Sequence, residues 1–481
     1  MKRPSLRFLI SRKFWQHSAF TLACLATLIV AAYEVEKYRG EKAWSDYRAE
    51  AEARGAKLDL KDFIPPPIPD EENFAAIPIY RELLSRDRVV RERARKACAI
   101  PLECRPYVAN GEPLDFPALG KCMVESALLP ATTDDAPADV LRALEYYEPV
   151  LAQMRAAVAR PGSRLDSEWE KGLNAAFWEM SNVLDIGKLI SLRVSALVAK
   201  DRGHEALIDW RVGFRHAGVF AGEPTLLACM LRVMLIALLA DNTSRELAAH
   251  PWSEDELRTI SSDLATIDLT SDFVLGMSSE RAFRNEALDR MKVTSGIFTA
   301  LQIGDPAKPP KWSWDILIPR GWFAQNQRHL NEWGDEQVAM AIAAQASAAI
   351  EISLPQFEIP QSWWRLPYWF VVRTSAYPMG GNLRICREVQ TNVDLCLVAC
   401  ALERFRLRNG DFPKELRDLV PDTLSKLPRD RFDGQALRYR RTDGGGVILY
   451  SAGRDCRDDG GDDAKDSVLR LRPVTPAARK F

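Results

Sequence analysis

The sequence has few histidines and lacks the short motifs that mark common enzyme classes. Only five histidines occur among 481 residues, and no HExxH pair is present to bind zinc. The GxSxG turn of serine hydrolases, the SxxK pair, the phosphate-binding Walker loop and GxGxxG are missing as well. An enzyme is therefore not excluded, but no motif supports one.

An excess of charge of one sign is also missing. The chain carries 65 basic and 66 acidic residues, which gives no global field to attract nucleic acid, and no nucleic-acid motif is present. Hydrophobic residues make up 47% and charged residues 27%. These proportions are ordinary for globular proteins and exclude wholesale disorder, and the length predicts more than one domain.

Acidic residues are absent before Glu34, and an uncharged segment of 20 residues, Phe14–Tyr33, lies in that region. This length is what one helix needs to cross the hydrocarbon core of a bilayer. Five cations precede the segment, and by the positive-inside bias they predict a cytoplasmic N-terminus and an extracytoplasmic body. The five are Lys2, Arg3, Arg7, Arg12 and Lys13.

A cleaved signal peptide is the alternative, because Val30-Ala31-Ala32 offers small residues to a signal peptidase. The length of the apolar run, and the absence of a helix breaker in Tyr33–Glu36, favour a retained anchor. Both interpretations export the body.

The pattern along the chain predicts a mainly α-helical fold. We expect an irregular α-helical bundle or solenoid, because helix–turn–helix units occur without a fixed 34-residue repeat. The expected order is a basic cytoplasmic tail (1–13), a transmembrane anchor (14–33), a juxtamembrane helix or stalk (34–62), a Pro- and Cys-containing linker region (63–136), an α-helical body (137–375), and a helix with a β-hairpin (385–472).

Cysteines cluster in the linker region, where Cys98, Cys104 and Cys122 lie among prolines and glycines. In an oxidising compartment a disulfide is expected there. Spacing alone does not choose between Cys98–Cys104 and Cys104–Cys122. Cys396 and Cys400, four residues apart on an expected helix, are interpreted as small buried hydrophobic residues.

The stalk, the GAKLDL stretch and the PPPIPDEENFA segment that follows it resemble uncharacterised membrane-anchored bacterial proteins. The resemblance covers about two-thirds of the chain and implies no activity. It adds architecture and no chemistry, and together with the segment Phe14–Tyr33 it leads us to expect a single-pass protein of the bacterial inner membrane.

Near the C-terminus the pattern changes from helix to short strands. Leu437–Arg440 and Val447–Ser451 flank Gly444-Gly445-Gly446, which predicts a β-hairpin. The preceding ALERF, NGDFP and LPRDRFDG stretches, followed by SAGRD, resemble the C-terminal half of a major pseudopilin of type II secretion. The resemblance covers about 75 residues and implies a helix packed on a small antiparallel sheet, with calcium holding the last loop.

The chain departs from that family in two respects. It has no prepilin-peptidase site before Phe14–Tyr33, and the module lies far from the anchor. A polymerising pilin subunit is therefore not expected.

A calcium site is also suggested by the residues themselves. Six aspartates crowd a glycine-containing loop after Ser451, and calcium binds six to eight oxygen ligands. A solvated acidic loop is the alternative. The candidate ligands are Ser451, Asp455, Asp458, Asp459, Asp462 and Asp463.

The expected function is that of a scaffold or interaction protein with a protein partner. One alternative is an exported hydrolase acting in the helical body, for which Glu168, Glu170 and Glu179 are the acids that lie near aromatics. Another is an accessory of a secretion or pilus-like system. A deep pocket lined by acids and tryptophans favours the hydrolase, and a shallow polar face favours the scaffold.

Overall fold

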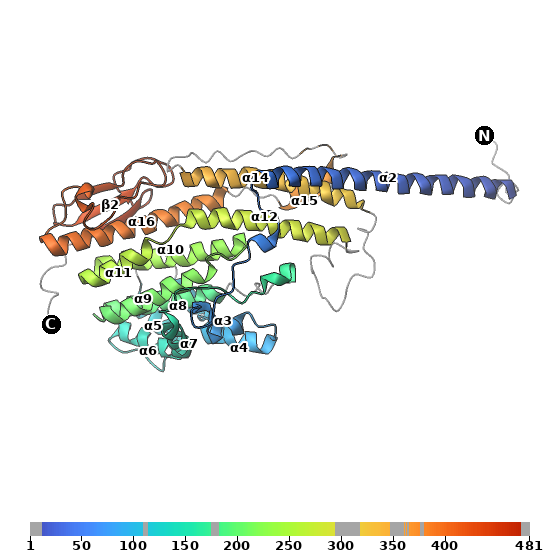
Figure 1. The fold of residues 1–481 in the computed structure, drawn as a ribbon. Coiled ribbons are helices and arrows are strands. Elements are labelled where there is room, and N and C mark those ends of the chain that lie inside the picture. The colour runs from blue at the N-terminus through green and yellow to red at the C-terminus, as the bar shows by residue number, and fades with distance from the viewer. Residues whose placement is uncertain are drawn as a thin grey trace, which may run out of the picture. The chain divides into compact units, whose positions relative to one another are not determined.

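The computed structural model describes residues 12–108, 114–174, 182–293, 318–346, 360, 362, 365–375 and 380–472. The fold is mainly helical, with one three-stranded sheet near the C-terminus (Figure 1). The chain divides into two compact units. Unit 1 comprises residues 1–62, 281–336 and 356–377, and unit 2 comprises 63–280, 337–355 and 378–481.

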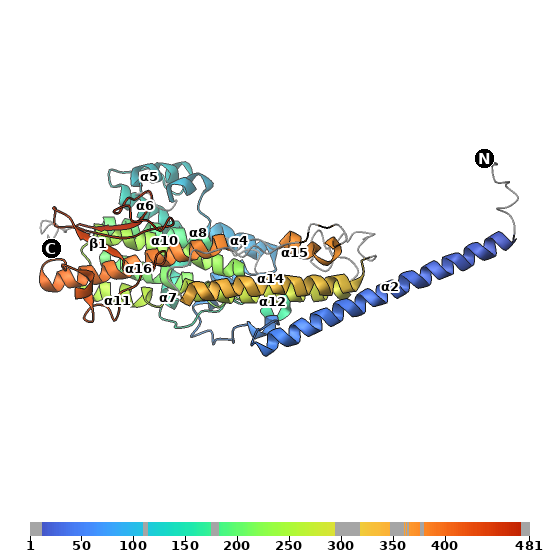
Figure 2. The ribbon, with the colours of Figure 1, turned by 90° about the horizontal axis from the view of Figure 1, so that it is seen from above.

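The apolar N-terminal segment and the stalk form one helix, α2 (Arg12–Ala53), of 42 residues (Figure 2). Its most apolar 18-residue window is 0% buried. The helix ends in a Schellman motif, in which Ala56 N donates to Ala51 O and Gly55 N donates to Glu52 O. Gly55 has a φ of +85°, which is the left-handed conformation expected at this position.

Three further segments complete unit 1. They are the part of α12 (Leu269–Val293) from Arg281, the part of α14 (Arg320–Ala346) up to Glu336, and α15 (Phe370–Ser375) with the 3₁₀ turn η9 (Leu366–Tyr368). The residue numbers of contacting pairs increase together along α2 and α14, from Glu36–Trp322 to Arg54–Asp335. These two helices therefore run parallel.

The interior of unit 1 contains many amides. Asn326, Gln327 and Asn331 are 0% exposed and Asn285 is 4% exposed. The Asn331 Nδ2 donates to Asn285 Oδ1 at 2.6 Å, and the Asn285 Nδ2 donates to the Leu58 carbonyl at 3.2 Å. Trp44 stacks on Tyr47 in a small apolar cluster beside this network.

Unit 2 begins in the region expected as a linker, 63–136, which the structure fills with short helices. These are α3 (Pro78–Leu83), α4 (Arg88–Cys98), η3 (Leu102–Val108) and α5 (Phe116–Glu125), besides η2 (Phe74–Ala76). Phe74 and Tyr80 are buried among them. The disulfide is Cys104–Cys122, and Cys98 is a buried free thiol.

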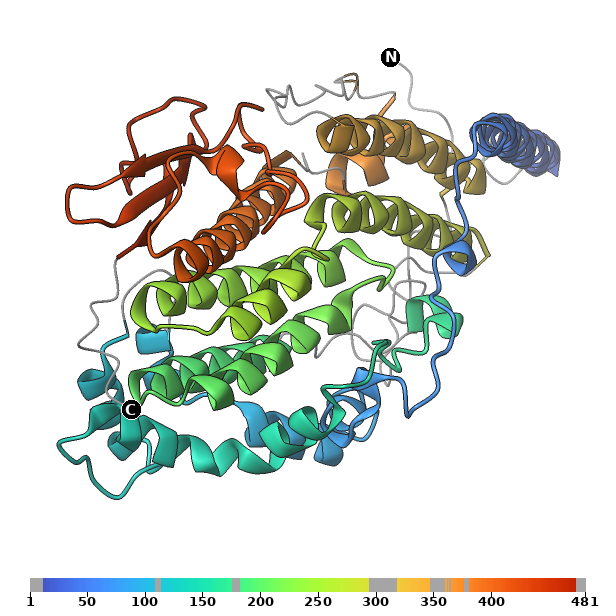
Figure 3. The ribbon, with the colours of Figure 1, turned by 60° about the vertical axis from the view of Figure 1, so that its left-hand side comes forward.

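Longer helices form the rest of unit 2. α8 (Val183–Ala199) packs against α9 (Gly203–Ala217) and α10 (Leu226–Ala249), and both α10 and α11 (Glu254–Leu264) pack against α16 (Gly380–Asn409) (Figures 1 and 3). The remaining elements are η1 (Leu60–Asp62) in unit 1, and α6 (Ala136–Leu144), η4 (Glu145–Tyr147), α7 (Glu148–Ala157), η5 (Trp169–Asn174), η7 (Gly218–Phe220) and η10 (Leu416–Leu419) in unit 2.

Helix α10 is apolar enough to pass as a second membrane span, but 67% of its apolar window is buried. Arg232, in its middle, pairs with Asp272 at 2.7 Å and donates to the Ala217 carbonyl. A core helix is therefore the correct interpretation of this segment.

The C-terminal module places α16 against a sheet of order β1-β2-β3, with β1 (Arg438–Arg441), β2 (Val447–Ser451) and β3 (Ser467–Leu471) (Figure 3). Both pairings are antiparallel, with Tyr439 opposite Leu449 and Leu449 opposite Leu469. The expected hairpin is confirmed, and β3 adds a third strand. All five residues of β2 are buried, because the strand lies between β1 and β3, α16 packs against it, and Gly461 of the following loop lies against Ile448 and Tyr450.

Candidate functional site

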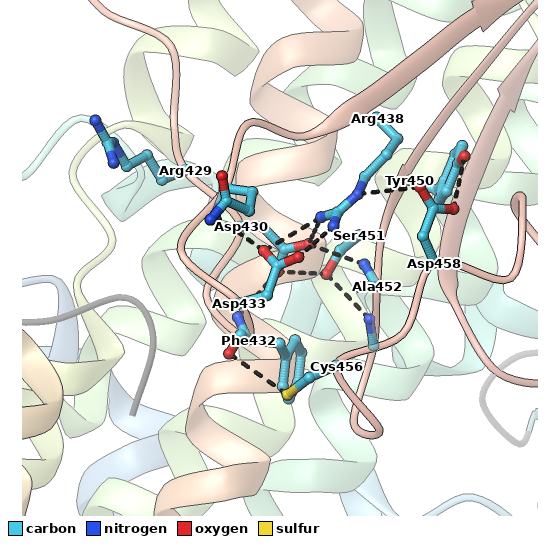
Figure 4. A network of polar contacts seen from close by, with 12 residues as sticks. Arg429, Asp430, Phe432, Asp433, Arg438, Tyr450, Ser451, Ala452, Cys456 and Asp458 are labelled. Carbon is cyan, nitrogen blue, oxygen red and sulfur yellow. Dashed lines mark hydrogen bonds and ion pairs between the residues drawn. The ribbon is translucent and has the colours of Figure 1, made fainter. Parts of the chain in front are cut away.

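The candidate calcium residues lie at the end of β2 and in the loop that leads to β3. The Ser451 hydroxyl donates to Asp430 Oδ1 at 2.8 Å, so it points to a carboxylate outside this loop (Figure 4). Asp458 Oδ1 accepts from the Tyr450 hydroxyl and from Gly460 N, both at 3.0 Å.

The other acids of the loop also have local partners. Asp459 pairs with Lys465 and Asp463 with Arg470, both at 2.9 Å, and Asp455 and Asp462 accept from backbone amides two residues on. In the described part of the chain, no three acidic, histidine or cysteine side chains converge to hold a metal. The calcium site stays a prediction.

The centre of the module is Asp430, which sequence analysis did not single out. This carboxylate is 0% exposed and accepts from Ser451 Oγ, Ala452 N, Phe432 N and Arg438 NH1 (Figure 4). Arg438 also pairs with Asp433. Four donors, one of them charged, offset the desolvation of a buried carboxylate. Asp430 thereby fastens the 428–434 loop to β2.

That loop forms one wall of a cleft. Arg431 leaves the loop and its Nε donates to Asp394 Oδ2 on α16 at 2.7 Å. The Gln390 amide, also on α16, donates to Asp394 Oδ1 and to the Ile267 carbonyl, and it accepts from Leu269 N. The wall formed by the loop is therefore tied to α16, and α16 is tied to the start of α12.

The cleft has a volume of about 620 Å³, within the range typical of ligand pockets. Its lining is mainly polar. The charged and amide groups are Arg258, Arg404, Lys426, Arg431, Asp268, Asp394, Gln345 and Gln390; the hydroxyls are Ser261, Ser262, Thr270, Thr423 and Ser425; the apolar groups are Leu264, Ala265, Ile267, Leu397, Leu424 and Pro428.

The charges of the lining favour an anion. Four cations and two carboxylates line the cleft, a formal excess of two positive charges, which Asp255 beside Arg258 and Glu254 beside Arg404 partly offset from outside the lining. Both carboxylates are already bound, Asp394 by Arg431 and Gln390, and Asp268 by Ser271. Burial raises the pKa of Asp394, and the Arg431 guanidinium opposes this shift.

One cation of the cleft has no ion-pair partner within the described residues: Lys426, which is exposed. The Ser261 hydroxyl, on a residue 7% exposed, lies beside the Cys400 thiol. The Arg404 guanidinium is fixed by Glu254 and by the Thr423 carbonyl. The cleft therefore combines fixed guanidinium groups with one unpaired ammonium group.

The described residues that line this cleft include no histidine. His216 is fully buried between the Tyr80 hydroxyl at 2.5 Å and the Val183 carbonyl at 2.8 Å, and burial lowers its pKa to about 4. His329 stacks on Trp369 in unit 1 with ring centroids 3.8 Å apart. These contacts give both histidines a structural role.

Two of the three acids named for a hydrolase are held in ion pairs. Glu168 binds Lys171 and Arg86, and Glu170 binds Arg164 at 2.8 Å. Glu179 lies outside the described residues.

Another acid, Glu223, which sequence analysis missed, is buried in unit 2. Burial raises the pKa of Glu223 to about 7, although the Trp169 indole and Leu165 N donate to its carboxylate. A carboxyl with such a pKa is suited to proton transfer. However, the cleft described above does not include Glu223.

Sequence signals for this site were weak. Arg404 and Arg431 fall within the stretches that resemble a pseudopilin, but Arg258 and Lys426 are ordinary surface cations in sequence. Only the fold brings residues 258–270 beside 423–431. Comparison with known proteins adds no name, because no family model, curated protein or solved structure matches the chain.

Proposed function

We propose that this protein is a single-pass membrane protein whose extracytoplasmic body binds an acidic segment of a partner protein in the cleft between α11, α16 and the 423–431 loop. The cationic, hydroxyl-rich lining of the cleft carries the proposal. Guanidinium and ammonium groups recognise carboxylates, and the apolar residues between them suit the carbon chains of a peptide.

Binding is favoured over hydrolysis by the same lining. A hydrolase needs a nucleophile with a base, or two separated acids. Here each carboxylate is held by a neighbour, as described for Asp394 and Asp268. The cleft thus fits the scaffold expectation better than the exported hydrolase. No observation in the structure favours a secretion-system accessory.

Anchoring rests on α2, which is long, apolar and exposed over its N-terminal half. We place the N-terminus in the cytoplasm and the body outside the bacterial inner membrane on the basis of the cations before Phe14. Fusions at Phe481 test this topology. A periplasm-active phosphatase is expected to be active and a cytoplasm-only fluorescent protein dark; the reverse result overturns the topology.

Binding is tested with full-length protein in detergent micelles. The probe is a fluorescein-labelled hexaglutamate peptide, with hexalysine as the negative probe, and the readout is fluorescence anisotropy. Hexaglutamate is expected to bind, and its affinity is expected to fall as the salt concentration rises. Equal binding of both peptides contradicts the proposal.

Charge reversal locates the site. Lys426→Glu removes an exposed cation that has no ion-pair partner in the described chain, and we expect the Kd for hexaglutamate to rise about tenfold. Lys414→Glu is the matched control, because Lys414 is also exposed in the C-terminal module but does not line the cleft. Equal effects of the two variants contradict binding in the cleft.

Calcium remains a separate proposal, as a structural ion of the loop between β2 and β3. Asp466, at the end of this loop, is 6% exposed, and its Oδ1 has no hydrogen-bond partner among the described residues. We expect millimolar calcium to raise the melting temperature of the full-length protein, and Asp458→Asn to reduce this shift. No shift, or an equal shift with magnesium, contradicts the site.

A further inference from the structure

The position of a residue along helix α2 gives its distance from the membrane. This inference rests on the proposed anchor, Phe14–Tyr33. With a rise of 1.5 Å per residue, Glu36 lies about 5 Å and Gly40 about 10 Å beyond the hydrocarbon boundary at Tyr33. The headgroup layer is about 5–8 Å thick on each side. Residues that contact Glu36 therefore lie at the depth of the lipid headgroups.

Two aromatic residues from distant parts of the chain meet Glu36 at this depth. The Trp322 indole donates to Glu36 Oε2 at 3.2 Å, and the rings of Trp322 and Tyr368 are 6.0 Å apart in an edge-to-face arrangement. Burial and the neighbouring Glu36 carboxylate raise the pKa of Tyr368. Neither ring is fully buried. Tryptophan and tyrosine are the residues that favour the membrane interface.

The beginning of α14 is fixed at the same depth. Gly321 packs so closely on α2 that a Cβ there would overlap the Glu36 carbonyl, and a Cβ at Gly40 would overlap the Gly321 carbonyl. Because α14 runs parallel to α2, its N-terminus is directed towards the bilayer. That end carries the positive end of the helix dipole.

Cations accompany the aromatic pair. Arg320, the first residue of α14, is exposed, and Arg39 has 59% of its side chain exposed while it pairs with Glu36 at 2.7 Å. Arginines just outside the hydrocarbon layer are well placed to bind lipid phosphates.

We propose that Trp322, Tyr368, Arg39 and Arg320 form a membrane-contact surface that seats unit 1 on the headgroups of the lipid leaflet around the anchor. The anchor then emerges beside a folded platform, so that the first two turns beyond Tyr33 do not act as a free stalk. The occupant of this surface is phospholipid.

The experiment uses full-length protein in vesicles made from phosphatidylethanolamine and phosphatidylglycerol, with a photoreactive benzoylphenylalanine at one position per variant. Tyr368→benzoylphenylalanine keeps an aromatic ring at the platform, and Arg320→benzoylphenylalanine probes the same surface at an exposed position. Glu50 is the negative control, since it is 73% exposed and lies about 25 Å beyond Tyr33 on the same helix. Leu25, within the anchor, is the positive control.

We expect lipid cross-links at positions 25, 368 and 320, at yields about tenfold above position 50, because only the first three lie within the lipid layer. Cross-linking at 25 without cross-linking at 320 and 368 overturns the platform and leaves the anchor intact. Equal yields at 50 and 368 also overturn it. Absence of cross-linking at 25 overturns the anchor, and the platform with it.

Discussion

The interiors of the two units differ in how polar groups are placed. In unit 1, three buried amides, Asn285, Gln327 and Asn331, are joined by hydrogen bonds between α12 and α14. In unit 2, α8, α9 and α10 enclose a largely apolar interior in which Ile186, Leu197 and Val212 are at most 1% exposed, and Ser195, Asn242 and Glu246 form a smaller buried polar group there. Burial of apolar area stabilises the folded state but does not require one particular orientation of the helices. Paired amides fix how one helix is aligned against the next.

The largest loss of stability is expected from the apolar interior. Trp210 is 2% exposed, and its indole donates to Thr243 Oγ1 at 2.8 Å. Trp210→Ala should lower the free energy of unfolding by about 3–5 kcal/mol, measured by urea denaturation of the full-length protein in micelles. Trp210→Phe keeps much of the ring volume and should cost clearly less. Equal losses would show that the hydrogen bond, and not the packing, matters.

The next largest effect on stability is expected from a buried carboxyl group in unit 2, that of Glu223. Burial raises the pKa of Glu223 from 4.5 to about 7, so its contribution to stability is complete below pH 4.5 and is lost as pH rises to 7. Burial lowers the pKa of His216 from 6.5 to about 4, so its contribution is lost as pH falls through that window. The two groups oppose each other.

Glu223→Gln should therefore match the wild type near pH 4.5 and exceed it at pH 8 by about 3 kcal/mol, with urea denaturation as the measurement. Glu170→Gln, at a side chain 63% exposed, is the control and should show no such difference. The same gain at both pH values would mean that ionisation of Glu223 is not its cause.

The polar interior of unit 1 is tested by a double-mutant cycle. Asn285→Ala and Asn331→Ala should each cost about 1–3 kcal/mol, because each leaves a buried amide without its partner. The double variant should cost less than the sum of the two, with a coupling of about 1 kcal/mol or more. Additive losses would contradict the view that the amides act as a pair.

The smallest effect is expected at the edge of unit 1, around Asp335. Arg54 and Arg281 both bind this carboxylate, but the Arg54 side chain is 51% exposed and that of Arg281 is 7% exposed. Arg54→Ala should cost less than about 1 kcal/mol, since exposed ion pairs contribute little. Arg281→Met should cost more, because it removes a buried partner of Asp335. Thermal unfolding of both variants makes the comparison, and a larger effect at Arg54 would reverse it.

Local features of the fold were predictable because their causes lie within a few residues. Ser253 and Glu256 form a capping box at the start of α11, which the Ser-x-x-Glu spacing indicates, and Gly55 and Gly410 adopt the left-handed conformation that follows a helix. The buried thiols Cys396 and Cys400 on α16 agree with their spacing as well.

Features that depend on distant pairing were not predictable. Arg281 is buried against Asp335, and Arg284 lies over the Trp333 ring, and the sequence indicates neither of these contacts between α12 and α14. From the sequence alone, the polar faces of α12 and α14 would be assigned to the solvent. Periodicity does not show that the two polar faces pack against each other. The cleft and the role of Asp430 were missed for the same reason.

The contact between Gly40 and Gly321 constrains how the protein is made. Arg54 and its partner Asp335, which belong to the same helix pair, are separated by 281 residues. At about 5–20 residues per second, a ribosome needs roughly 15–60 s to synthesise that interval. Throughout this time Gly40 lacks the residue on which it packs, Gly321, so α2 has to persist without its parallel partner α14.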